Sequence, residues 1–187
     1  MSDAAAGAPA PYVSRYPSPL GGITLVCDGG AITGLRFDGQ RGFEDAPAAP
    51  TAGEEPAVIS LAKEWLDIYF SGREPGFTPP LRLDGTPFQK AVWDILLTIP
   101  YGRTATYGEI AKVIEERLCV KKMSAQAVGG AVGRNPVSLI VPCHRVVGSD
   151  GSLTGYAGGI GRKRRLLELE GAGINDMSLP GNARREK

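Results

Sequence analysis

The chain has 187 residues, of which 42% are hydrophobic and 22% are charged, and its formal net charge is +1. These values are typical of a globular protein with a sizeable core, and they exclude a collagen, a coiled coil and a wholly disordered chain. The sequence contains no apolar run of about 18 residues and does not begin with a secretory signal. We therefore expect a cytoplasmic protein with no membrane association.

Charge differs between the two halves of the chain. Residues 1–84 carry 6 basic and 11 acidic side chains, whereas residues 85–187 carry 15 basic and 9 acidic ones. A basic second half favours a polyanionic partner such as a nucleic acid, although a solvated face without a partner explains such a bias about as often.

The first half predicts a small α+β domain over residues 12–80. Three short apolar runs, near residues 12–16, 23–27 and 32–37, are separated by turn sequences that contain paired glycines, which is typical of an antiparallel meander. Apolar residues at helical spacing over residues 58–69 predict one amphipathic helix that covers the sheet. We expect flexible tails at residues 1–11 and 172–187 and a surface loop at residues 44–56.

The second half, residues 85–171, predicts a mainly helical domain. Thr86 and Thr106 each begin a capping-box sequence, and Ser124 is the candidate N-cap of a third short helix. Three short helices in this order form a helix-turn-helix pattern, whose third helix is the candidate recognition helix. A last helix is expected at residues 161–170.

The candidate recognition helix, residues 125–133, consists almost entirely of small residues and includes Gly129 and Gly130. Each glycine inside a helix costs about 1 kcal/mol, so the pair needs a reason. Close approach of this helix to a nucleic-acid groove would supply one, and tight packing against another helix would explain the glycines equally well.

The tetrapeptide Pro142-Cys143-His144-Arg145 places a thiol beside the only histidine of the chain. A cysteine nucleophile needs a base or a positive neighbour to form the thiolate, and His144 and Arg145 are suitable types. The β-branched run at residues 137–141 predicts a buried strand whose end presents Cys143. A buried structural cysteine is an equally good interpretation, because neighbouring side chains on a strand point to opposite sides.

Glu170 is predicted in the last turn of its helix, where the helix dipole disfavours a negative charge by about 0.3–1 kcal/mol. A carboxylate bonded to the far nitrogen of His144 would fix the tautomer of the imidazole and raise its basicity. An ordinary exposed glutamate at a helix end is the simpler interpretation of the sequence alone.

Beyond these patterns, the chain resembles a known family. It contains, in order, the segments GTPFQKAVW, IPYGRTATYGEIA, QAVGGAVGRNP, VPCHRVVGSDGSLTGYAGG and RKRRLLELEG. These closely resemble the O6-alkylguanine-DNA alkyltransferases, also called methylated-DNA–protein-cysteine methyltransferases. The resemblance covers residues 85–171 almost without interruption, and PCHRV followed by LTGYAGG is its most specific part. Residues 12–80 resemble the family's N-terminal domain more loosely.

The resemblance implies an α+β fold, with a small ribonuclease H-like sheet and covering helix before a winged helix-turn-helix-like catalytic domain. It also implies DNA repair, in which an alkyl group moves once and irreversibly from the O6 oxygen of a flipped guanine to the protein. O4-alkylthymine is a further candidate substrate. We expect a monomer that binds double-stranded DNA carrying O6-alkylguanine and needs no cofactor and no metal.

The resemblance assigns roles to individual residues. Cys143 matches the alkyl acceptor, His144 the base that deprotonates it through a bound water, and Glu170 the carboxylate that orients the histidine. Asn135 matches the residue that braces the active-site turn, and Tyr107 the hydroxyl that donates to the leaving guanine. The base pocket is matched by Val146, Tyr156, Ala157, Gly158 and Gly159, and the DNA-binding positions are Gln126, Ala127, Gly130, Ala131 and Arg134.

Four features depart from the family pattern. Gln126 stands where many relatives carry an arginine finger, which predicts weaker duplex binding. Ala157 replaces a serine found in some relatives and so removes one hydrogen bond near O6. Residues 115–122 lengthen the turn before the recognition helix. The N-terminal half contains Cys27 but no histidine, so we expect no structural zinc there.

Two other functional classes fit parts of the sequence. A lesion-sensing helix-turn-helix protein would bind DNA without reacting, but non-reactive relatives replace the acceptor cysteine, whereas Cys143 is present. A Cys–His hydrolase would need an oxyanion-hole motif, which is absent, and it would leave the helix-turn-helix pattern unexplained.

Overall fold

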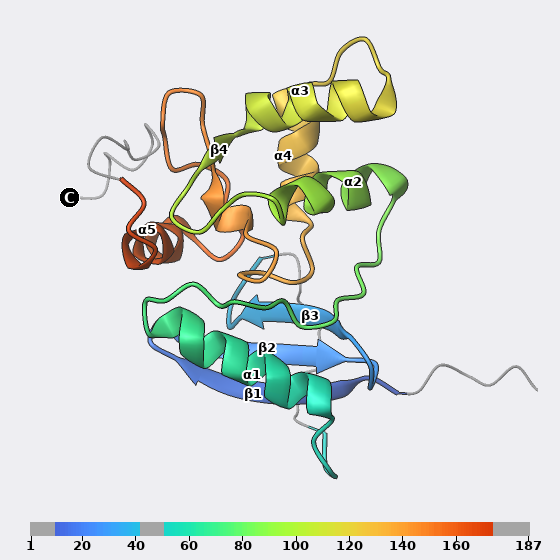
Figure 1. Cartoon of the computed structure of the whole chain (residues 1–187), viewed down its shortest axis with the longest axis vertical. Coiled ribbons are helices and arrows are strands. Elements are labelled where there is room, and N and C mark those ends of the chain that lie inside the picture. Colours follow the sequence, from blue (N-terminus) through green and yellow to red (C-terminus); the bar gives the residue numbers. More distant parts are fainter. Residues whose placement is uncertain (1–9, 42–50, 174–187) are drawn as a thin grey trace, which may run out of the picture.

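The computed structural model describes residues 10–41 and 51–173 of the chain. Most of the two predicted tails, and residues 42–50 around the predicted surface loop, lie outside the described residues. The described end of that loop, residues 51–56, contains no helix or strand. Figure 1 shows a sheet with one covering helix in one half of the molecule and the remaining helices in the other half.

The N-terminal half is the predicted meander and helix. The strands β1 (Tyr12–Ser18), β2 (Gly21–Cys27) and β3 (Ile32–Phe37) pair antiparallel in the order β1-β2-β3. Helix α1 (Ala57–Phe70) lies across one face of this sheet (Figure 1). Its inner face is formed by apolar residues at helical spacing: Val58, Ile59, Ala62, Trp65, Leu66 and Tyr69.

Three short helices open the second half as predicted: α2 (Pro87–Leu96), α3 (Tyr107–Leu118) and α4 (Ala125–Gly133). Both predicted capping boxes are present, because the Thr86 and Thr106 side chains accept from the backbone N–H groups of Gln89 and Glu109. The buried Trp93 ties α2 to α4 by donating from Nε1 to the Ala131 carbonyl at 2.9 Å. These contacts set the orientation of the candidate recognition helix.

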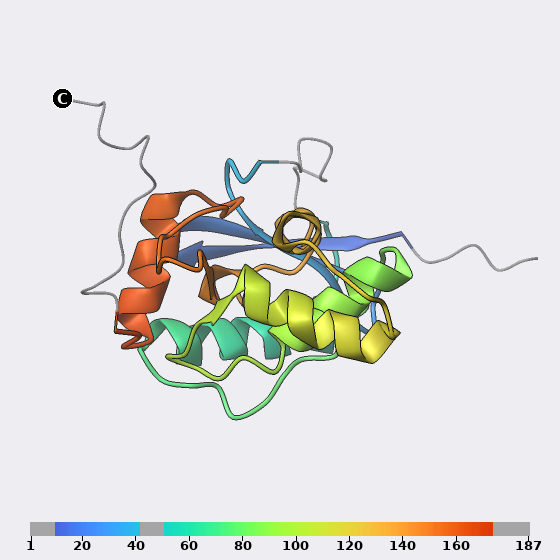
Figure 2. The same cartoon turned by 90° about the horizontal axis from the view of Figure 1, so that it is seen from above.

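The chain then forms a short 3-10 helix η1 (Cys143–Arg145), a strand β5 (Val146–Val147) and the helix α5 (Ile160–Leu169). Strand β5 pairs in parallel with β4 (Ala105–Thr106), a contact that the sequence did not predict. Seen from above in Figure 2, α5 lies on one side of α4 and the C-terminal end of α3 on the other.

The predicted strand at residues 137–141 is wrong. Only Val137 makes a bridge, to Leu35 of β3, and the chain then turns, with Leu139 at a φ of 70°. The Asn135 side chain takes the place of a neighbouring strand: its Oδ1 accepts from the Val137 N–H at 3.0 Å and its Nδ2 donates to the Val141 carbonyl at 2.8 Å. The apolar pattern at residues 137–141 therefore belongs to a buried turn and not to a strand.

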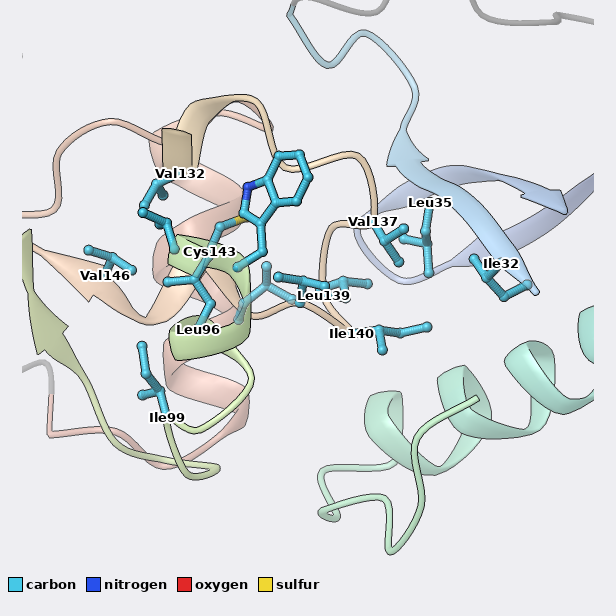
Figure 3. Close-up of a cluster of buried hydrophobic side chains, with 14 of the residues drawn as sticks. Ile32, Leu35, Leu96, Ile99, Val132, Val137, Leu139, Ile140, Cys143 and Val146 are labelled. Atoms are coloured by element: carbon cyan, nitrogen blue, oxygen red, sulfur yellow. The ribbon is translucent and has the colours of Figure 1, made fainter. Parts of the chain in front are cut away.

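The two halves share one hydrophobic core, which reaches the turn before η1. Figure 3 shows Leu139 and Ile140 of that turn between Cys143 on one side and Leu35 and Ile32 of β3 on the other. Both isolated bridges of β3, to Leu81 and Val137, lie in this region. The β3 edge of the N-terminal sheet thus packs directly against the turn that precedes η1. No helix within the described ranges is both long and apolar enough to cross a membrane.

Candidate active site

Cys143 lies in a nearly closed apolar environment at the start of η1. It is only 5% exposed, and Figure 3 shows its side chain among Leu96, Val132 and Val146. Burial raises the pKa of the Cys143 thiol, while the side chains of Asn135 and Ser138 and the charge of Lys163 oppose that rise. The thiol therefore stays protonated near pH 7 and requires a base to become a nucleophile.

His144 is fully buried, and its two ring nitrogens have different surroundings. Its Nε2 lies 2.6 Å from Oε1 of Glu170, whereas Nδ1 has no hydrogen-bond partner among the described residues. Burial lowers the pKa of His144 despite the neighbouring carboxylate, so the ring is neutral near pH 7. A neutral ring that donates from Nε2 to Glu170 keeps a lone pair on Nδ1, which makes Nδ1 the basic atom.

Glu170 is 6% exposed, which excludes the exposed helix-end glutamate considered from the sequence. Its Oε2 accepts from Arg145 Nε at 2.8 Å and from the Gly102 N–H at 3.1 Å, and its Oε1 accepts from the Tyr69 hydroxyl at 2.8 Å. Burial alone would raise the pKa of Glu170, but the hydrogen bond from His144 and the hydrogen bonds and positive charge of Arg145 lower it to about 2. Glu170 is therefore ionised at every physiological pH.

Sequence reasoning missed part of this network. Arg145 was considered as a positive neighbour for the Cys143 thiol, but its guanidinium bonds Glu170 and the Ile99 carbonyl instead. Tyr69 comes from α1, and no spacing in the sequence links it to a residue 101 positions away. The only sequence signal for Tyr69 was its position on the apolar face of the predicted helix, which indicated a buried side chain but no partner.

The charge that acts on Cys143 belongs to Lys163 of α5, which sequence reasoning also missed. Its ammonium group is fully buried and donates to the carbonyls of Val146 and Thr154. Burial lowers the pKa of Lys163 from 10.5 to about 8, although the neighbouring thiol opposes this. The side chain links β5 to the middle of the segment between β5 and α5, and its positive charge stabilises a negative charge on sulfur.

The burial of Lys163 predicts a pH-dependent stability. Between pH 8 and 10.5 the unfolded chain binds a proton at this lysine that the folded chain has lost, so the free energy of unfolding should rise with pH across this interval. The difference between the two values corresponds to about 3 kcal/mol. Urea unfolding of the wild type and of Lys163→Met at pH 7.5 and pH 10 measures it. If the free energy of unfolding changes equally with pH in both proteins, the pKa of Lys163 is not lowered in the folded state.

Tyr107 packs against the segment at residues 154–159, which sequence analysis assigned to the base pocket. The Tyr107 hydroxyl donates to the Thr154 carbonyl at 3.2 Å, and burial raises its pKa, with Cys143 as a second cause. Close approach explains two glycines here: a Cβ at Gly155 would lie 2.8 Å from the Tyr107 hydroxyl, and one at Gly158 would lie 2.6 Å from the Tyr156 ring.

The remaining residues predicted for the base pocket differ in their burial. Val146 and Tyr156 are buried, Ala157 is half-buried and Gly159 is exposed. The Tyr156 hydroxyl is buried without a hydrogen-bond partner among the described residues, and its ring meets that of His144 edge-on. Tyr156 thus lies beside the proposed base, whereas Gly159 lies at the start of α5.

Four of the five predicted DNA-binding residues are accessible. Gln126, Ala127 and Arg134 are exposed and Gly130 is half-buried, but Ala131 is 2% exposed and packs in the core beside Trp93. Ala131 lies on the buried face of α4, together with Val128 and Val132.

The glycine pair of α4 is not explained by tight packing. A Cβ at Gly129 would meet the Tyr107 ring at 3.7 Å and one at Gly130 would meet Arg134 at 3.5 Å, which are ordinary contact distances. Packing within the described residues therefore does not require glycine at either position.

The described residues contain no cluster of three or more histidine, cysteine or acidic side chains that could hold a metal ion. All three cysteines are free: Cys27 and Cys143 are buried and Cys119 is exposed.

Comparison with known proteins agrees with this geometry. The family model of the 6-O-methylguanine DNA methyltransferase DNA-binding domain matches residues 87–172, and that of the ribonuclease-like domain matches residues 12–83. A methylated-DNA–protein-cysteine methyltransferase of Mycobacterium tuberculosis is 48% identical over 153 residues, which cover 82% of this chain and 88% of the relative. The Haemophilus influenzae protein of the same name is 41% identical and covers 85% and 86%.

A solved structure shows the same relationship. A crystal structure of Mycobacterium tuberculosis OGT in complex with DNA has a TM-score of 0.72 and 44% identity, and the match covers 86% of this chain and 92% of that one. The expected fold class, a small antiparallel sheet followed by a helical domain, is confirmed. The chain belongs to the methylated-DNA–protein-cysteine methyltransferase family.

Proposed function

We propose that the chain repairs duplex DNA by moving an alkyl group from the O6 oxygen of guanine to its own Cys143. The observation that carries this proposal is the buried pair in which Glu170 holds Nε2 of His144 at 2.6 Å, so that the basic Nδ1 is left without a protein partner next to the thiol-bearing residue. The names of the relatives, and the DNA complex of one of them, support the same reaction.

The residues fit each step of the transfer. His144 Nδ1 takes the thiol proton through a bound water, the thiolate attacks the alkyl carbon, and the bond between that carbon and O6 breaks. The leaving guanine takes a proton from Tyr107, whose hydroxyl must first release the Thr154 carbonyl. Tyr107 is then reprotonated from the His144 side, so that the proton lost by Cys143 ends on guanine. The product is an S-alkylcysteine and unmodified DNA.

The roles of the other elements follow from their positions. An alkylated base can reach a buried thiol only if it leaves the helical stack, so the exposed face of α4 would lie against the DNA while the base enters beside Tyr156 and Ala157. We assign residues 85–171 to catalysis and DNA binding and residues 12–80 to the supporting domain. In this proposal the protein acts as a monomer in the cytoplasm. Its three cysteines are free, as expected in a reducing compartment.

A titration of damaged DNA tests this function. Purified protein is mixed with a duplex that carries one O6-methylguanine, and the remaining lesion is measured as the protein-to-DNA ratio increases. The expected loss is one lesion per protein molecule, with no turnover, because the thioether is stable. Cys143→Ala should remove none. Multiple turnovers, or binding without any loss of the lesion, would refute the proposal and favour a hydrolase or a lesion sensor.

A further inference from the structure

The turn that carries the active site depends on the N-terminal sheet for its shape. Leu139 has a left-handed backbone with a φ of 70°, which a leucine adopts only when its surroundings hold it there. The support comes from the free edge of β3: Leu35 donates its N–H to the Pro136 carbonyl at 3.0 Å and accepts from the Ser138 N–H at 2.8 Å. Figure 3 shows Leu35 and Val137 side by side at this contact.

Gln40, in the turn that follows β3, adds a side-chain link to the same segment. Its Oε1 accepts from the Phe37 N–H at 3.3 Å and from the Ser138 hydroxyl at 3.2 Å. Because a backbone N–H can only donate, the Phe37 contact fixes Oε1 toward Ser138, and the Ser138 proton is therefore directed to Gln40. Gln40 and Ser138 are 7% and 1% exposed, so water does not readily replace this bond.

The same turn also contacts the segment that is predicted to line the base pocket. The Arg41 N–H donates to the Ala157 carbonyl at 3.2 Å. Arg162 of α5 lies over the Phe37 ring, 4.9 Å from its centroid, and donates to the Gly158 carbonyl at 3.2 Å. Residues 35–41 thus bond both the segment that precedes Cys143 and the segment that is predicted to line the base pocket.

We propose that Gln40 is a positioning residue for alkyl transfer, which through Ser138 holds the active-site turn in register with the predicted base-pocket segment. The proposal rests on the proposed function, because the rate that Gln40 would control is that of transfer to Cys143. The N-terminal domain then keeps the sulfur aligned with the alkyl carbon. A displacement of about 1 Å between reacting atoms costs up to about a hundredfold in rate, so a smaller loosening should cost about tenfold.

Single-turnover kinetics test this assignment. The rate of methyl transfer is measured against protein concentration for the wild type, Gln40→Met, Gln40→Glu and Ser138→Ala, which separates the maximal rate from half-saturation. Gln40→Met should lower the maximal rate about tenfold without changing the half-saturating concentration. Gln40→Glu keeps an oxygen for both donors and should retain more of the rate. In the Gln40→Met/Ser138→Ala protein the loss should equal that of Ser138→Ala alone, because Gln40 acts through Ser138, whose hydroxyl also opposes the rise in the Cys143 pKa.

A matched control separates positioning from general stability. Ser14→Ala removes a buried hydroxyl from β1 of the N-terminal sheet, which donates to Glu55 and not to the active-site turn. This variant should keep the wild-type maximal rate. A wild-type maximal rate in Gln40→Met, or an equal loss in Ser14→Ala, would overturn the assignment. Failure of the wild type itself to transfer the methyl group would instead refute the proposed function, so the two failures are distinguishable.

Discussion

Replacing His144 with glutamine is expected to slow methyl transfer about a thousandfold while leaving the protein folded. A positioned general base contributes between about a hundredfold and ten-thousandfold, and the thiol of Cys143 has a raised pKa and so depends on one. Glutamine can still donate to Glu170 but has no basic nitrogen. Single-turnover rates from pH 6 to 9 measure the effect.

The pH profile gives the second part of this prediction. Because burial lowers the pKa of His144 from its ordinary value of 6.5, the wild-type base is mostly neutral by pH 7, and the wild-type rate should change little above that pH. The rate of the variant should rise steadily with pH, since direct ionisation of the thiol is then its only route. Tyr16→Phe, which removes a tyrosine hydroxyl that donates to Asp67 and has no contact with His144 or Glu170, serves as a control and should keep the wild-type profile. A flat profile in the His144 variant would contradict the assignment of the base.

Replacing Glu170 with glutamine should reduce the free energy of unfolding by about 3–5 kcal/mol, the usual cost of leaving one member of a buried ion pair unpaired. The charge left behind is that of Arg145, whose side chain is 10% exposed and bonds Glu170 at 2.8 Å. The variant should also transfer the methyl group more slowly, because His144 loses the acceptor that fixes its tautomer. Urea unfolding and single-turnover rates measure the two effects.

A double variant distinguishes stability from catalysis. Arg145→Met in the Glu170→Gln protein removes the unpaired charge and should restore part of the stability but none of the rate. If both recover together, Glu170 acts only through folding and not through His144.

The acid dependence of stability follows from the same carboxylate. The pKa of Glu170 is about 2 in the folded protein and 4.5 in its ordinary environment, so its contribution is complete above pH 4.5 and disappears as the pH falls toward 2. The wild type should lose stability across this interval, and Glu170→Gln should lack that part of the loss.

Local signals in the sequence predicted the elements that local interactions build. The three strands, α1 and the two capping boxes depend on turn glycines, apolar spacing and residues three positions apart, and all are present. The predicted strand at residues 137–141 failed for a related reason. A buried turn and a buried strand show the same apolar pattern, and only the side-chain bonds of Asn135 distinguish them.

The active site was only partly predictable because its supports are distant in sequence. Family resemblance predicted Cys143, His144 and Glu170, but Tyr69 and Gln40 reach the candidate site from the N-terminal half, and their partners are 101 and 98 positions away. Lys163 was hidden for a different reason. A lysine among three arginines suggests a solvated basic face, and only packing shows that this one side chain points into the core.

Mapping the modified residue tests the central claim most directly. The protein is incubated with a duplex that contains O6-methylguanine, digested, and its three cysteine peptides are weighed by mass spectrometry. We predict a gain of one methyl group on the peptide that contains Cys143 and no change on those of Cys27 and the exposed Cys119. Methylation of Cys119 or Cys27, or an unmodified Cys143 after the lesion has disappeared, would contradict the account.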